Sequence, residues 1–386
     1  MRIRIQRRGL VPAAVAAVVG TAALYVGSTT GLAAWHASQS DPRAGVGYLP
    51  TVVENAPTSV PTTDVYGPPG TVAVVYAGTE VEQGLTGSLP APWIAISSRT
   101  GDYRALDAPG LPQAGAGAVV VSPDGARLAW TGPEGLVLYD AVTGETSRPG
   151  VTGVDRVGAF SQDGSLLAVH SGGLKVLEVG SGDVVAETQA GAEAVAGAAW
   201  RPDGSALDLV DGGDLVTVTV GGEVMTQPTT IPADAQLAWS PSGDRIAELH
   251  EESGNNRLFL SHLRGDGTVG RGERVDTSGL SLQHLLGFSG ERTVAVDAFA
   301  LESGSVERVL DVSLSGGSPT DLTILPPPGD NWVDTSTLAV ATDTLLKGSY
   351  AWDSPVWPWS YTARLGACAL LMFVLFGLYV TRRPRA

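Results

Sequence analysis

The sequence Ser122-Pro-Asp-Gly125 recurs with small changes three more times along the middle of this 386-residue chain. The further copies are Ser161-Gln-Asp-Gly164, Arg201-Pro-Asp-Gly204 and Ser240-Pro-Ser-Gly243, and the steps between copies are 39, 40 and 39 residues. A short apolar run precedes and follows each copy. A fixed period of about 40 residues indicates a repeat architecture built from one supersecondary unit.

The residues of this signature are those that a tight turn requires. Proline presets φ near −65°, aspartate can bond its own backbone, and glycine accepts the positive φ that closes a hairpin. Asp124, Asp163 and Asp203 occupy the same place in successive units. We therefore interpret these acids as turn residues and expect no functional site among them.

Each unit has the sequence pattern of four strands. This predicts an all-β fold, namely a β-propeller of four-stranded blades over residues 71–347. The first unit offers three strands, at 71–76, 93–97 and 102–106, without an innermost one. The end of the repeat region supplies strands near 331–333 and 337–340 without a complete blade. We expect these ends to pair and close the ring, because closure removes exposed edges. The count favours six blades, with seven as the alternative.

The turn signature followed by an apolar strand resembles the WD-repeat-like propeller repeat of the TolB family of bacterial proteins. The resemblance covers roughly residues 71–347 and implies the fold, whereas the shared residues say little about function. Residues 71–347 contain no Gly-His or Trp-Asp dipeptides of eukaryotic WD repeats, and a counterpart of the TolB N-terminal domain is missing because a Pro-rich segment occupies its place. A TolB role in an outer-membrane system is therefore not implied.

Two apolar stretches flank the repeats and are expected to be transmembrane helices. Residues 9–34 follow a basic N-terminus, 1–8, and residues 362–381 precede a basic tail, 382–386. Each stretch is about as long as the roughly 20 helical residues that a bilayer core requires. The first is interpreted as an uncleaved anchor, with a cleaved signal peptide as the alternative, because it is longer than a secretory apolar region.

Charge predicts the orientation of the chain in a bacterial plasma membrane. All 40 acidic residues lie between Asp41 and Asp353, together with 16 of the 24 basic ones, so this part carries a formal charge of −24. Basic residues favour the cytoplasmic side, so both termini are expected there and the propeller outside. The acidic surface disfavours nucleic acid. The use of Arg over Lys indicates a GC-rich bacterium, plausibly an actinobacterium.

The remaining segments connect the expected propeller to the membrane. Residues 35–70 contain six prolines without periodicity and are predicted to form a stalk that contributes no core. Residues 348–361 form a shorter membrane-proximal leash. Cys368, the single cysteine, falls in the second apolar stretch, so the outer part has no disulfide.

Three patterns that could carry chemistry have simpler explanations. Residues 265–270 match GxGxxG, but they fall in a hairpin loop, where no helix N-terminus can meet a pyrophosphate. The histidines are scattered over different units, and His170 and His250 are expected on opposite faces of their strands. The acidic run of Asp203, Asp208, Asp211 and Asp214 lacks the spacing of a calcium loop. We therefore expect no catalytic, cofactor-binding or metal-ligating residues.

These observations favour a membrane-anchored extracytoplasmic propeller that binds a protein or cell-envelope partner as a scaffold, sensor or assembly factor. The alternative is an extracytoplasmic lyase or hydrolase that acts on a sugar or peptide at the central channel. Propeller enzymes assemble their sites from separate blades, so a missing linear motif argues only weakly against this alternative. Charged side chains converging on the channel would favour the enzyme, and an apolar channel would favour the binding protein.

Overall fold

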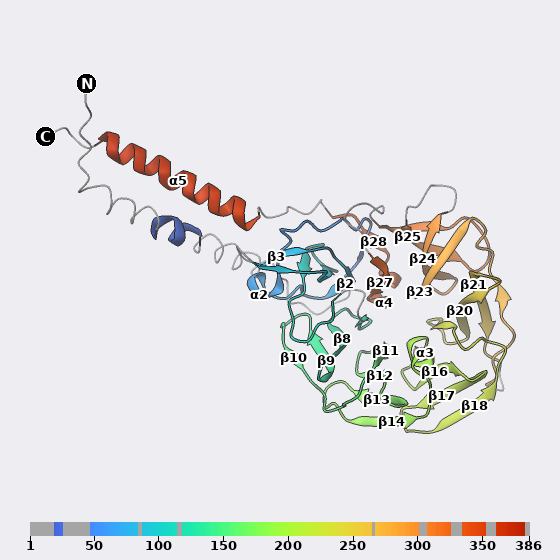
Figure 1. Cartoon of the computed structure of the whole chain (residues 1–386). Helices are drawn as coiled ribbons and strands as arrows, with labels where there is room; N and C mark the ends of the chain where they lie inside the picture. Colours follow the sequence, from blue (N-terminus) through green and yellow to red (C-terminus); the bar gives the residue numbers. More distant parts are fainter. Residues whose placement is uncertain are drawn as a thin grey trace.

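The computed structural model describes residues 19–25, 47–83, 87–113, 118–264, 267–300, 307–325, 334–352 and 360–382. Within these ranges the strands form six four-stranded sheets and two short two-stranded ones. Figure 1 shows the larger sheets arranged as a ring. The chain is an all-β propeller of six four-stranded blades, which confirms the predicted fold class and the favoured blade count.

Blades two to six each use four strands that are consecutive in the chain and pair in chain order. Their strands are β7 (Val119–Val121), β8 (Arg127–Gly132), β9 (Gly135–Asp140) and β10 (Thr146–Ser147); β11 (Arg156–Phe160), β12 (Leu166–His170), β13 (Leu174–Glu178) and β14 (Val184–Thr188); β15 (Ala199–Trp200), β16 (Ala206–Asp211), β17 (Asp214–Thr219) and β18 (Val224–Pro228); β19 (Gln236–Trp239), β20 (Arg245–Glu252), β21 (Asn255–His262) and β22 (Glu273–Arg274); and β23 (Leu280–Gly290), β24 (Thr293–Ala300), β25 (Glu307–Ser313) and β26 (Thr320–Ile324).

Blade one joins the two ends of the repeat region. It contains β27 (Asp334–Val340), β2 (Val72–Ala77), β5 (Trp93–Ser97) and β6 (Tyr103–Ala105), in that order. In the antiparallel pairing of β2 with β27, Val74 is opposite Val340 and Val75 is opposite Ala339. The innermost strand that the first unit lacks therefore comes from the end of the chain, which confirms the expected ring closure.

Four smaller elements complete the propeller. They are the hairpin of β3 (Val81–Gln83) and β4 (Gly87–Leu89), helix α3 (Ala192–Ala196) before blade four, and helix α4 (Thr342–Lys347) directly after β27.

The hydrophobic core lies between neighbouring blades, so central strands are buried on both faces. All five residues of β5 are buried. One apolar cluster combines Leu136 and Leu138 of β9 with Phe160 and Leu167 of the next blade. Strands buried on both faces need continuous apolar runs rather than alternation. The outermost strand β10 is exposed at both of its residues, as expected where a sheet ends at the surface.

The turn signature is held together by its own side chains. In the first copy, Ser122 is fully buried, its Oγ accepts the N–H of Arg127 at 2.9 Å and donates to Asp124 at 2.6 Å. Asp124 also accepts the N–H of Ala126 at 3.0 Å, and Gly125 has φ of +71°. Asp163 is held in the same way by Ser161, and these bonds lower its pKa. Asp124 and Asp163 thus accept hydrogen bonds from residues of their own turns.

The third copy replaces the serine by Arg201, and a buried network compensates for the change. Arg201 Nε donates to Asp208 at 2.8 Å, and the Asp208 carboxylate has no exposed surface. Thr217 donates to the same carboxylate, and the guanidinium lies 5.3 Å from the ring centre of Trp239 in the next blade. A buried carboxylate needs such a partner, so Arg201 has a structural role here.

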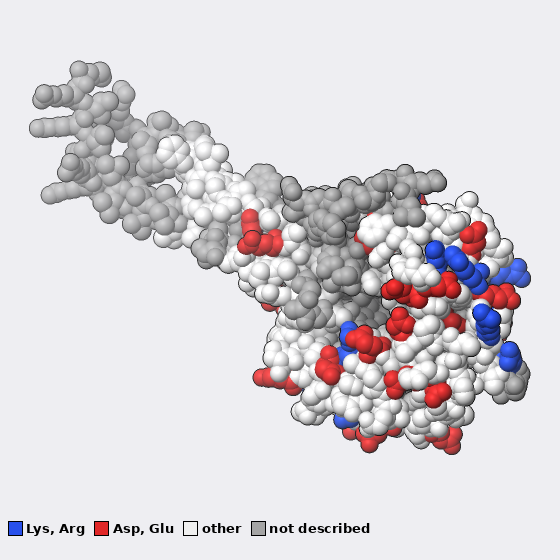
Figure 2. All heavy atoms as spheres, turned by 45° about the vertical axis from the view of Figure 1, so that its right-hand side comes forward, with Lys and Arg blue, Asp and Glu red and all other residues white. Residues whose placement is uncertain are grey.

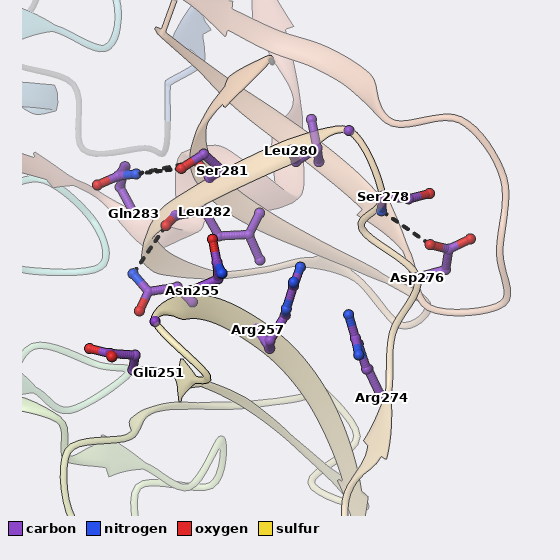
Figure 3. Close-up of a pocket in the computed structure, with 13 residues that line it drawn as sticks. Glu251, Asn255, Arg257, Arg274, Asp276, Ser278, Leu280, Ser281, Leu282 and Gln283 are labelled. Atoms are coloured by element: carbon purple, nitrogen blue, oxygen red, sulfur yellow. Dashed lines mark hydrogen bonds between the residues drawn. The ribbon is translucent and has the colours of Figure 1, made fainter. Parts of the chain in front are cut away.

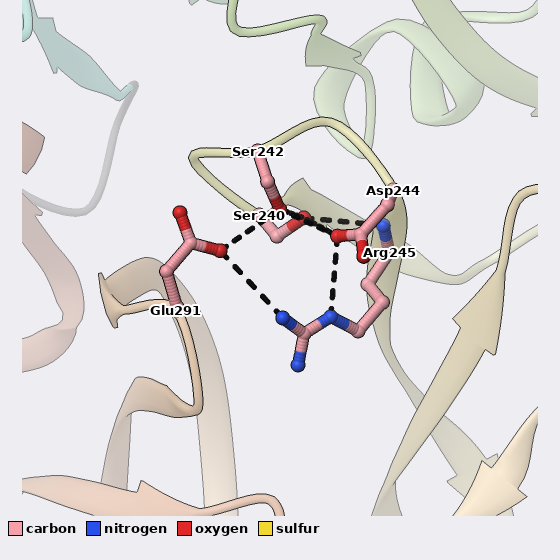
Figure 4. Close-up of polar contacts among 5 residues, drawn as sticks. All are labelled: Ser240, Ser242, Asp244, Arg245 and Glu291. Atoms are coloured by element: carbon pink, nitrogen blue, oxygen red, sulfur yellow. Dashed lines mark hydrogen bonds and ion pairs between the residues drawn. The ribbon is translucent and has the colours of Figure 1, made fainter.

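The fourth copy links blade five to blade six (Figure 4). Asp244 accepts hydrogen bonds from Ser240, Ser242 and Arg245, and these bonds, led by that of Ser242, lower its pKa to about 2. Ser242 Oγ also donates to Glu291 at 2.8 Å, and Arg245 Nη2 lies 3.6 Å from the same carboxylate. Since Glu291 follows β23, this cluster ties together the turns of two blades.

Residues 47–66 differ from the predicted stalk. Leu49, Val53 and Val60 are 1%, 1% and 2% exposed and join the core of blade one. Strand β1 (Leu49–Pro50) pairs in parallel with β28 (Ser349–Tyr350), so part of the predicted leash is also held on the propeller. The expectation that the Pro-rich segment contributes no core is therefore wrong for these residues, because its scattered apolar side chains find partners only in the closed ring.

Helix α5 (Tyr361–Arg382) projects from the rim beside blade one (Figure 1). At its start, Arg364 Nη1 donates to the hydroxyl of Tyr66, the last residue of α2 (Thr63–Tyr66), at 2.6 Å. The helical residues 19–25 lie beside α5, since a Cβ added to Gly20 would be 2.5 Å from Met372 Cε. Of the helices in the described residues, none combines the length and apolar character that a membrane crossing requires.

Two signature glycines allow a matched test of the turn geometry. Gly125 and Gly204 share a φ near +70°, at +71° and +69°. A Cβ at Gly125 would lie 2.0 Å from the carbonyl oxygen of Val72 in blade one, whereas a Cβ at Gly204 would meet nothing within 4 Å. We expect Gly204→Ala to cost about 1–2 kcal/mol of folding free energy through its φ, and Gly125→Ala to cost roughly 2 kcal/mol more through the clash. Equal losses in denaturant unfolding would contradict this packing of blade one against blade two.

Candidate functional site

The centre of the ring is a channel with a volume of about 860 Å³. The innermost strands of all six blades form its wall, and most of the wall residues are small or apolar. They include Val120, Gly158, Ala159, Ala199, Ala238, Leu286 and Leu338. Small side chains leave the axis open, so the channel provides a concave apolar surface of the kind that binds ligands.

Helix α4 braces one end of this channel by contacting three blades. The N–H of Asp343 donates to Pro123 O in blade two at 3.0 Å. Gln162 Nε2, in the turn of blade three, donates to Asp343 Oδ1 at 2.6 Å. Thr342 lies beside Gly287 of blade six. Burial, together with the charge of Asp124, raises the pKa of Asp343.

The opposite end of the channel carries a second group of polar wall residues. Arg156, at the start of β11, forms an ion pair with Glu193 of α3. Gln236 of β19 accepts the N–H of Leu285 at 2.8 Å, and its amide nitrogen lies 3.5 Å from Nδ1 of His284. These groups bond one another across neighbouring blades, so this end is a polar rim around an apolar channel.

The histidines considered from the sequence do not form a site in the described residues. His170 Nδ1 lies 2.5 Å from Asp155 Oδ1 in blade three. His250 stacks on Phe259 in blade five with ring centres 4.5 Å apart, and burial lowers its pKa. His284 lines the channel in blade six. His36 lies outside the described residues, and His262 is exposed at the end of β21.

The acidic run of blade four is also divided among separate structural roles. Asp203 accepts hydrogen bonds from Ser205 in its own turn, and Asp208 pairs with Arg201. Asp211 and Asp214 are opposite each other at the end of the hairpin of β16 and β17. Over the ranges that the structure describes, no group of three or more His, Cys, Asp or Glu residues could hold a metal ion.

The GxGxxG match lies where the sequence placed it, between β21 and β22. Gly265 and Asp266 fall outside the described residues. The described part continues the hairpin, since Leu263 bridges Val269 and the N–H of Arg264 donates to Thr268 O at 2.8 Å. Strand β22 follows, so the segment does not open a helix.

Sequence reasoning missed a buried acidic pair in blade six. Asp297 of β24 has no exposed surface, and Glu307 of β25 is 5% exposed. The register places them diagonally on one face, because Asp297 is opposite Val309 and Phe299 is opposite Glu307. Burial, and then the neighbouring Glu307, raises the pKa of Asp297 to about 9. In the sequence, the position of Asp297 within the apolar run Val294–Ala298 indicated that this acid would be buried.

Comparison with known proteins found similar chains among solved structures. No family model and no curated protein sequence matches it. Among solved structures, it is similar to TolB from Acinetobacter baumannii (16% identity, TM-score 0.46, 72% of this chain and 69% of that chain). It is also similar to the β-propeller domain of Cps50 (Swd1) from Myceliophteria thermophila (14%, 0.35, 55% and 87%). In hydrazine synthase from Kuenenia stuttgartiensis (17%, 0.41), the match covers 53% of this chain and only 65% of that chain.

The acidic pair predicts a dependence of stability on pH. Between the ordinary pKa of 3.8 and about 9, the folded chain keeps a proton on Asp297 that the unfolded chain has released. The stability from this group is therefore complete below pH 3.8 and is lost as pH rises toward 9. We expect the melting temperature of Asp297→Asn to rise relative to wild type by on the order of 5 °C between pH 5 and pH 8.

The matched control is Asp183→Asn, which removes a carboxylate from an exposed turn. Its melting temperature should follow that of the wild type at every pH. Parallel curves for Asp297→Asn and wild type would show that Asp297 is ionised in the folded protein and would contradict this assignment.

Proposed function

We propose that this protein is an extracytoplasmic propeller, held at a bacterial plasma membrane, that binds a protein or cell-envelope partner as a scaffold, sensor or assembly factor. The observation that carries the proposal is the channel of about 860 Å³ with an apolar wall. Burying an apolar wall favours association with a partner. The partner meets the channel at the end bordered by Arg156, Gln236 and His284.

The position of α4 supports this choice of end. Asp343 is bonded to blades two and three, and Thr342 lies against blade six, so α4 spans the other end. Small residues line the channel along the length of the inner strands. The polar side chains at the proposed end already take part in an ion pair and in hydrogen bonds. A partner can therefore use these side chains as an orienting rim around an apolar centre.

The membrane attachment rests mainly on the sequence, through the apolar stretches 9–34 and 362–381 and the arginines beside them. Helix α5 exposes large apolar side chains, with Leu370 65% and Phe373 74% exposed. Gly20 lies near Met372, and Tyr25 lies near Arg364 and Cys368, so the two segments run antiparallel. An antiparallel pair is consistent with both termini on the cytoplasmic side.

A photo-crosslinking amino acid at a channel position tests partner binding. Placed at Gln236 in full-length protein in its native membranes, it should give a defined adduct. The polar variant Ala159→Gln, which fills the apolar wall, should reduce the adduct by roughly tenfold at unchanged melting temperature. The control position is Thr226, exposed on the outermost strand β18 of blade four. An adduct of equal yield at Thr226, or one insensitive to Ala159→Gln, would contradict channel binding.

Reporter fusions test the proposed topology. Alkaline phosphatase fused after Gly348 should be active, because this position would lie outside, and a cytoplasm-active reporter after Ala386 should also be active. Mass spectrometry of the mature protein should find residues 1–34 retained. An inactive phosphatase at Gly348 would overturn the orientation, and loss of residues 1–34 would leave one anchor.

A further inference from the structure

A second cavity lies between blades five and six, which we call the notch. It has a volume of about 570 Å³. One wall is the hairpin of β20 and β21, and the other is the connection from β22 into β23. Asn256 Nδ2 donates to Leu282 O at 3.0 Å, which fixes the walls relative to each other (Figure 3). The shape of the notch is therefore fixed by the fold.

Two arginine side chains, Arg257 and Arg274, point into the notch from separate strands (Figure 3). Within the described residues, the Arg257 guanidinium forms no hydrogen bond or ion pair. Arg274 forms an ion pair with Glu252, with 3.8 Å between its Nη1 and the carboxylate oxygen, and its charge also acts on Asp276. Two other polar residues of the notch bond their neighbours, since Asp276 accepts the N–H of Ser278 at 3.1 Å and Gln283 donates to Ser281. The donors of the Arg257 guanidinium, and those of Arg274 that do not face Glu252, are thus available to a ligand.

Residues 257–292, which contribute most of the notch, are nearly neutral in an otherwise acidic protein, because five basic residues there offset four acidic ones. Five of the 16 basic residues between Asp41 and Asp353 fall within residues 257–292, namely Arg257, Arg264, Arg271, Arg274 and Arg292. Figure 2 shows several basic side chains at one edge of the molecule with acidic ones beside them, and mostly acidic side chains over the rest of the face. Repulsion by the remaining surface should therefore guide an anionic ligand toward this edge.

We propose that the notch binds an oxyanion, a carboxylate or phosphate group, on a polar ligand. A guanidinium presents paired N–H donors that match such a group, and two guanidinium groups can bind it from different sides. The acids Glu251 and Asp276 also line the notch, so the rest of the ligand should carry hydroxyl or N–H donors.

The notch and the channel are adjacent along one strand. Leu280, Leu282 and Gln283 of β23 line the notch, and His284 and Leu285, which follow directly, line the channel. The inference goes beyond the proposed function and does not depend on it, because the notch has its own walls and its own donors. A partner bound at the channel end could still present its anionic group here.

Calorimetric titration of purified full-length protein tests the proposal. Sodium pyrophosphate and citrate serve as probes of the two oxyanion classes, at a constant ionic strength set with sodium chloride. We expect saturable binding of at least one probe, and Arg257→Gln and Arg274→Gln should each weaken it about tenfold or more. The matched control is Arg148→Gln, which removes a similarly exposed arginine, 47% against 54% for Arg274, from blade two.

The control variant should change the affinity by less than about twofold, because Arg148 lies in blade two and its ion pair is with Glu134, outside the notch. Ala159→Gln in the channel should leave probe binding unchanged, which separates this site from the proposed partner site. Binding of pyrophosphate alone identifies a phosphate site, and binding of citrate alone identifies a carboxylate site. Failure of both probes to bind the wild type at about 10 mM, or equal weakening by Arg148→Gln, would overturn the proposal.

Discussion

The pairing of β27 with β2 is the constraint on which the rest of this structure depends. Every other blade is made of strands that pair in chain order, so their contacts are local. Only blade one requires residues such as Val74 and Val340 to meet from opposite ends of the repeat region. That contact costs the loop-closure entropy of the whole ring. In return it removes the free edge of β2, encloses the channel and places α4 against three blades.

Much of the architecture could be predicted from the sequence because its determinants are local. Ser122, Asp124 and Gly125 form their turn through bonds within a few residues, so the signature predicts the hairpin wherever it recurs. The first unit lacks an innermost strand. Because an unpaired strand edge is unfavourable, this gap predicted that a strand from the end of the repeat region would pair there and close the ring. The segment 47–66 was misjudged because its core residues follow no period. Their burial depends on surfaces that exist only after the ring has formed.

The candidate sites depend on tertiary contacts, which explains why the sequence pointed to a central channel but to none of the residues that form either site. The bond between Gln162 and Asp343 joins residues that are distant in the chain, and it becomes visible only when the channel is closed. Arg257 and Arg274 are unremarkable in a strand pattern, and the notch between them requires the placement of blade six against blade five. Asp297 could be noticed in the sequence because it lies within an apolar run. That Glu307 lies beside it is known only from the strand register.

The attachment of both chain ends to blade one has a mechanical consequence. The strap formed by residues 47–66 is held by β1 and α2, and α5 is held to Tyr66 by Arg364, so both ends leave the ring at the same place. Two attachments at one place on the rim limit how far the ring can rotate relative to helix α5. A pulling force on either end reaches blade one before any other blade. The blade that closes the ring would therefore be the first to yield under tension, and its opening would widen the channel.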